Sequence, residues 1–89
     1  MTREELLDQA RRCVCGQREQ DYGSPEDNFI NIAKLWAAYL DTLIGPEDVA
    51  IMMILMKIGR LIGSQYMSED SWVDIAGYAA CGAEISNNK

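Results

Sequence analysis

The sequence contains no histidine, and this absence excludes several common catalytic mechanisms. Histidine is the side chain that most often serves as a general base near neutral pH. Its absence also excludes the Ser–His and Cys–His pairs that activate nucleophiles in many enzymes. We therefore do not expect histidine-dependent catalysis.

Basic residues are also few, because eight lysines and arginines stand against fourteen acidic residues and the net charge is −6. Proteins with a general affinity for nucleic acid need cations that displace the counterions of the phosphates. We therefore do not expect nucleic acid among the partners.

The three cysteines, Cys13, Cys15 and Cys81, lack the spacing of a zinc site. A structural zinc ion takes four good ligands, and the chain offers three thiols and no imidazole. The N-terminal residues read MTREELLDQ, which is amphipathic and acidic rather than a signal peptide. We expect reduced thiols in a soluble, cytoplasmic protein.

The longest apolar run is the eight residues Val49–Met56, and Lys57 interrupts it. A membrane-spanning helix needs about 20 apolar residues, so we do not expect a membrane partner. Gly45 and Pro46 mark the start of a helix that continues to Ile62. Because its apolar residues face all directions, we expect it to be central, surrounded by its own chain or a neighbouring copy.

Two helices are expected before this one. The first starts at Arg3 with a capping box of Thr2 and Glu5, and runs to about Gly16. The second follows Ser24 as N-cap, with Pro25 as its first residue, and runs to about residue 43. Its main apolar stripe consists of Phe29, Ile32, Ala33, Trp36, Leu40 and Leu43.

A last helix is expected from about residue 68 or 70 to about residue 85. Gly77 and Gly82 inside it lower the helix propensity by roughly 1 kcal/mol each. Close packing against another helix would offset that cost, because the run AGYAACGA is almost entirely small residues.

The sequence shows no strand pattern or repeat, and its 89 residues suit one domain, residues 1–89. It predicts an all-α fold, a small four-helix antiparallel bundle with short connections. The last three helices are apolar on too many sides for a monomer of this size. We therefore expect a homo-oligomer, with a dimer as the default.

The first group of candidate functional residues surrounds the turn at Gly23 and consists of Arg18, Tyr22, Asp27 and Asn28. Arginine can bind an anion, tyrosine can stack on a ring, and N–H groups at a helix start can hold phosphate oxygens. Helix capping alone explains Ser24, and also Asp27, so the group could equally be an ordinary turn.

Lys57 and Arg60 form the second group, three residues apart in the most apolar helix. They could hold a phosphate or carboxylate in a dry cleft. Alternatively, they could extend into water at the helix C-terminus, or pair with carboxylates of the last helix.

The third group consists of Asp70, Asp74 and Tyr78, which share one face of the last helix. The small residues around Asp74 indicate partial burial, which requires a cation or metal partner. An antiparallel hairpin predicts that Lys57 pairs with Asp74 and that Arg60 pairs with Asp70.

Three segments of the sequence are distinctive: CGQREQDYGSPEDNF (15–29), DVAIMMILMKIGRL (48–61) and DSWVDIAGYAACGAE (70–84). Together they resemble a family of short phage and prophage proteins of unknown function. The resemblance covers nearly the whole chain. It implies a phage-derived accessory protein in the cytoplasm of the host cell.

The acidic residues Glu26, Asp27, Asp70 and Asp74 faintly resemble the motifs of MazG-like all-α nucleotide pyrophosphohydrolases. Those proteins hold Mg²⁺ with Glu-Glu-x-x-Glu on one helix and Glu-x-x-Asp on the next. Here a third acid is missing after Asp27, and Asp70 and Asp74 are four residues apart. Under this likeness Asp27, Asp70 and Asp74 would bind Mg²⁺.

Three functions remain open from the sequence. The first is non-catalytic binding of a small anionic, nucleotide-like ligand, with no cofactor, through Arg18, Tyr22, Asn28, Lys57, Arg60, Asp70, Asp74 and Tyr78. Trp36 is a further candidate for stacking on a base. The second is Mg²⁺-dependent nucleotide pyrophosphohydrolysis. The third is inhibition of a basic host protein by an acidic surface.

Overall fold

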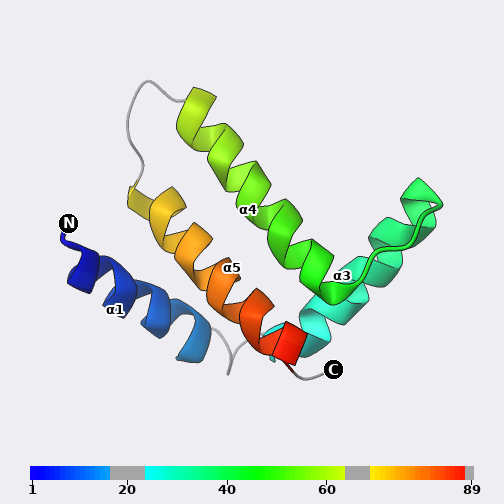
Figure 1. Ribbon diagram of the computed structural model, residues 1–89, viewed down its shortest axis with the longest axis horizontal. Helices are drawn as coiled ribbons and strands as arrows, with labels where there is room; N and C mark the ends of the chain where they lie inside the picture. Colours follow the sequence, from blue (N-terminus) through cyan, green and yellow to red (C-terminus); the bar gives the residue numbers. More distant parts are fainter. Residues whose placement is uncertain (17–23, 64–68, 88–89) are drawn as a thin grey trace.

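The computed structural model describes residues 1–16, 24–63 and 69–87. These ranges contain four helices, α1 (Arg3–Cys15), α3 (Pro25–Leu40), α4 (Pro46–Gly63) and α5 (Glu69–Asn87). No strand occurs within the described ranges, and the predicted all-α class is confirmed (Figure 1). None of the described helices combines the length and the apolar character needed to cross a bilayer.

The helix starts follow the local signals in the sequence. The hydroxyl oxygen of Thr2 accepts a hydrogen bond of 3.1 Å from the backbone N–H of Glu5. Ser24 caps α3 in the same way, since its Oγ atom accepts a bond of 3.3 Å from the N–H of Asp27. Side-chain oxygens at these positions satisfy N–H groups that have no partner within the helix.

The predicted extension of the second helix to residue 43 is wrong. α3 ends at Leu40 because Asp41 adopts a left-handed backbone conformation, with φ of 52°, and its N–H bonds to the carbonyl of Ala37. A residue in this conformation ends a helix. Consequently Leu40 and Leu43, predicted as members of the apolar stripe, are 53% and 98% exposed.

The helices are not arranged as four antiparallel neighbours. α4 and α5 form an antiparallel hairpin, whereas α1 lies beside α5 and runs in the same direction (Figure 1). The amino group of Met1 lies 3.4 Å from Oε1 of Glu69, which places the starts of α1 and α5 together. α3 begins near the end of α5 and then diverges from α4. The antiparallel bundle as a whole is therefore not confirmed.

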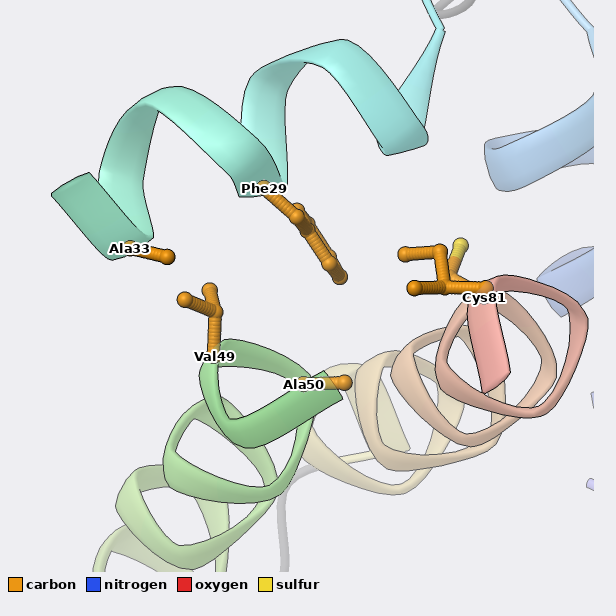
Figure 2. Close-up of a cluster of buried hydrophobic side chains, with 6 residues drawn as sticks. Phe29, Ala33, Val49, Ala50 and Cys81 are labelled. Atoms are coloured by element: carbon orange, nitrogen blue, oxygen red, sulfur yellow. The ribbon is translucent and has the colours of Figure 1, made fainter. Parts of the chain in front are cut away.

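The core lies where α3, α4 and α5 meet. Figure 2 shows Phe29 and Ala33 of α3 directed toward Val49 and Ala50 of α4, with Cys81 of α5 beside them. The close approach predicted for the last helix is confirmed, and it appears at both of its glycines. A Cβ atom on Gly82 would lie 2.9 Å from the Cβ of Ala50, and one on Gly77 would lie 3.1 Å from Cγ1 of Val14.

The outer face of α4 is exposed within the single chain. Ile51, Leu55, Ile58 and Ile62 repeat at intervals of four, three and four residues, and 38–81% of each residue is exposed. The described helices thus cover one side of α4 and do not surround it. The expectation of a central helix is not met within one chain, and the alternative of covering by a neighbouring copy stays a prediction.

Candidate functional site

A cavity of about 370 Å³ lies between α1, α3, α4 and α5. This volume falls within the range of cavities that bind small molecules. The α3 wall consists of Pro25, Asn28, Phe29, Asn31, Ile32 and Leu35. The α5 wall consists of Val73, Asp74, Gly77, Tyr78 and Cys81. Cys13 and Val14 of α1 and Met53 of α4 complete the lining, so the cavity depends on all four helices.

Asp74 and Tyr78 are the two residues of the α5 wall whose side chains contain oxygen. They are four residues apart and therefore lie on one face of the helix, one turn from each other. The ring of Tyr78 packs against Phe29 of α3, with 6.2 Å between the ring centroids and an angle of 38° between their planes. The Tyr78 hydroxyl has no hydrogen-bond partner among the described residues. It can donate one bond and accept others.

The ion pair between Lys57 and Asp74 fixes the position of the carboxylate. The Nζ atom of Lys57 lies 2.8 Å from Oδ2 of Asp74, with 12% of the lysine side chain and 36% of the aspartate side chain exposed. The predicted pair is confirmed. Within the described residues this is the one polar contact of Asp74, and it uses one of the two carboxylate oxygens. Oδ1 can therefore still accept bonds from a ligand.

The second predicted pair is wrong. Arg60 and Asp70 are both exposed, and no ion pair joins them in the described part of the chain. Both residues lie at the end of the hairpin where α4 finishes and α5 begins, and both are exposed to water, which screens a salt bridge and makes it worth little. Neither residue lines the cavity.

The remaining candidates divide between the cavity and other places. Asn28 lines the cavity, as predicted for a ligand contact. Trp36 packs against the core cluster and is not part of the cavity lining. Arg18 and Tyr22 lie outside the described residues, so their predicted roles stay predictions.

The acidic residues proposed as Mg²⁺ ligands are not brought together. Asp27 is exposed at the start of α3, where its backbone N–H bonds to the Ser24 cap. Among the residues in the described ranges, no three side chains of Asp, Glu, Cys or His gather as a metal shell requires. Asp27, Asp70 and Asp74 therefore do not form one metal site within this chain.

Sequence reasoning missed several lining residues. Asn31 lies three residues after Asn28, and this helical spacing could have indicated a second amide on the same side of α3. Cys13 and Cys81 carry no such signal, because their place in the lining depends on how α1 packs beside α5. The three cysteines all lie in the described ranges and form no disulfide.

Comparison with known proteins places the chain in a family. Residues 5–86 match the model of a domain of unknown function, DUF6378. The Gene 55 protein of Mycobacterium phage D29 is 47% identical over 78 residues, which cover 88% of this chain and 51% of the relative. The Gene 55 protein of Mycobacterium phage L5 is 49% identical over 75 residues, which cover 83% and 47%.

The chain thus spans about half the length of the curated relatives it matches. No solved structure matches it. The predicted resemblance to a phage family of unknown function is confirmed, and the chain belongs to the phage protein family defined by the DUF6378 domain.

Proposed function

We propose that this protein binds a small nucleotide-like ligand in the cavity between its helices and catalyses no reaction on it. One observation carries the proposal: Asn28, Asp74 and Tyr78, three residues singled out from the sequence, line the same cavity. Ligand cavities are typically mostly apolar, with a few convergent polar groups that orient the ligand. This cavity has that composition.

The walls suit a flat ring. Phe29 and Tyr78 supply neighbouring aromatic faces, and Ile32, Val73 and Met53 supply apolar contacts. The polar atoms come from side chains on two facing walls, α3 and α5. A heterocycle between these walls would bury its faces against apolar groups and direct its edge toward the carboxylate, hydroxyl and amide groups.

Lys57 and Arg60, two of the cations predicted to hold the anionic part of the ligand, are not part of the cavity lining. Lys57 forms an ion pair with the lining residue Asp74, and Arg60 is exposed near the end of α4. Negatively charged groups of a bound nucleotide would therefore lie outside the cavity, with only its ring system inside.

Binding is better supported than hydrolysis. Hydrolysis with Mg²⁺ would need Asp27, Asp70 and Asp74 around one ion, and these residues do not gather within the chain. The sequence also lacks histidine as a general base. Inhibition of a basic host protein by the acidic surface is an alternative that makes no use of the cavity.

Isothermal titration calorimetry with nucleosides and linear and cyclic nucleotides tests the proposal. We expect saturable binding by the wild type and its loss in Asn31→Trp, because an indole at this exposed lining position would fill the cavity. Lys34→Trp is the matched control, since Lys34 is exposed on the same helix outside the lining. Absence of heat across the whole panel would contradict the proposal.

We further propose that the protein acts in the cytoplasm of the host cell as a homo-oligomer, with a dimer as the simplest form. The support is the exposed stripe of α4, formed by Ile51, Leu55, Ile58 and Ile62. Apolar residues alternating at intervals of four and three form the seam along which two helices pack. A second copy of α4 would cover this stripe.

A further inference from the structure

The charge that faces the cavity does not suit a phosphate. Asp74 is the one charged residue among the described residues of the lining, and its side chain is a carboxylate. Phosphate groups bind to cations and to N–H donors, and a carboxylate repels them. Among its described residues, the lining therefore offers no cation that could hold a phosphate.

The ion pair determines what Asp74 can recognise. Lys57 holds Oδ2 at 2.8 Å and so fixes the side chain, while Oδ1 can accept a bond from a ligand. A carboxylate accepts hydrogen bonds and donates none. A ligand atom placed against Asp74 must therefore be a donor, and a carbonyl oxygen at that place would meet a second acceptor.

The neighbouring polar group extends this selection. Tyr78 lies one helical turn from Asp74 on the same wall, and its hydroxyl has no hydrogen-bond partner among the described residues. It can donate to a ring nitrogen. An amino group beside a ring nitrogen, as in cytosine and adenine, presents a donor next to an acceptor. Asp74 and Tyr78 present the complementary acceptor and donor.

We propose that the cavity selects nucleobases that carry an exocyclic amino group, and that it recognises the base rather than the phosphate. This inference rests on the proposed function. The amino group donates to Oδ1 of Asp74, the adjacent ring nitrogen accepts from the Tyr78 hydroxyl, and the ring lies against Phe29. Bases with a carbonyl in place of the amino group are disfavoured, because two acceptors then face each other.

Two matched pairs of nucleosides test this selection by calorimetry on the wild-type protein. Cytidine carries an amino group on its base where uridine carries a carbonyl. Adenosine and inosine differ in the same way. We expect at least one amino-bearing nucleoside to bind about 10- to 100-fold more tightly than its carbonyl partner, as for a hydrogen bond to a charged group. Cytidine monophosphate should bind within about threefold of cytidine if the phosphate lies outside.

Asp74→Asn tests the residue itself, because an amide both donates and accepts. The preference for the amino-bearing nucleoside should then fall to about threefold or less. Asp70→Asn is the matched control, since Asp70 lies one turn earlier on α5 outside the lining, and it should keep the wild-type preference. If Asp74→Asn does not fold, the nucleoside pairs on the wild type decide the question.

The outcomes separate the two proposals. Equal binding within both pairs, or a preference for uridine or inosine, would overturn the selection while leaving cavity binding intact. A monophosphate that binds more than about tenfold tighter than its nucleoside would also overturn it, since recognition would then depend on the phosphate. Absence of binding by every nucleoside and nucleotide would overturn both the selection and the proposed function.

Discussion

Lys57 and Asp74 face each other across the α4–α5 hairpin, with 2.8 Å between Nζ and Oδ2. The lysine side chain is more deeply buried than its partner, since 12% of it is exposed against 36% of the aspartate side chain. A buried charge without a partner is costly, so each residue depends on the other for its place in the structure. Asp74 also lines the cavity, so the ion pair links the stability of the fold to the proposed binding.

The first prediction concerns this pair. Asp74→Ala leaves Lys57 without its carboxylate and should lower the free energy of unfolding by about 1–3 kcal/mol. We expect less than the 3–5 kcal/mol typical of fully buried pairs, because Asp74 is partly in contact with water. Urea denaturation followed by circular dichroism measures the change.

The double variant Lys57→Met, Asp74→Leu provides the matching control, and it should recover much of the lost stability because no charge is left unpaired. Asp70→Ala, on the exposed part of the same helix, should change the free energy of unfolding by less than about 0.5 kcal/mol. An Asp74→Ala variant as stable as Asp70→Ala would show that the ion pair contributes little.

The second prediction concerns the contact between α4 and α5. Gly82→Ala places a methyl group 2.9 Å from the Cβ of Ala50, too close for unstrained packing. The helices must separate, and we expect a loss of about 1–3 kcal/mol despite the better helix propensity of alanine. Thermal and urea denaturation both report this loss.

Gly59→Ala is the control for this substitution, because no atom lies within 4 Å of the added Cβ at that position of α4. It should stabilise the protein by about 0.5–1 kcal/mol through helix propensity. If Gly82→Ala stabilised the protein to the same degree, the close approach of the helices in solution would be disproved.

The third prediction concerns self-association through the outer face of α4. Leu55→Lys places a charge in the middle of the exposed apolar stripe, in a helix whose other side packs against α3 and α5. Analytical ultracentrifugation should show an oligomer for the wild type and a monomer with unchanged helicity for the variant. A wild-type protein that stays monomeric at every concentration measured would contradict the proposed oligomer.

The fourth prediction concerns pH. Arg11 donates a hydrogen bond of 2.8 Å to Asp8, and together with the charge of Arg12 it holds the pKa of Asp8 below its ordinary value of 3.8. The group is more acidic in the folded state, so its stabilising effect is present above that value. The effect is lost as the pH falls through the lowered pKa.

Comparison with Asp8→Asn measures this contribution. The wild type should be slightly more stable at neutral pH, and the difference should vanish in strong acid, with a small amplitude because these side chains are exposed. If the difference in stability between the two proteins persisted unchanged at low pH, it would not come from the charge of Asp8.

Local signals in the sequence predicted the helix starts well. Thr2 and Ser24 each need only the next three residues to form their caps, so neither depends on the tertiary fold. The Lys57–Asp74 pair was also predictable, because an antiparallel hairpin determines which residues face each other. The same hairpin register predicts that Arg60 faces Asp70, but these two residues form no ion pair because both are exposed and solvated.

The sequence did not predict where α3 ends or how the helices pack against one another. The left-handed conformation of Asp41 ends α3 three residues early, although the apolar pattern continues to Leu43. Nothing in the local pattern indicated that α1 would run in the same direction as α5. That packing brings Cys13 and Val14 to the cavity. The sequence therefore predicted Asn28, Asp74 and Tyr78 as site residues but not the α1 part of the lining.

The central claim is that the cavity between the helices is the binding site, and a ¹H–¹⁵N NMR titration with cytidine and adenosine tests it most directly. The account predicts that saturating shift changes concentrate at lining residues of α3 and α5, including Asn31, Gly77 and Tyr78. Spectra that stay unchanged, or changes confined to the exposed end of α4 around Arg60, would contradict it.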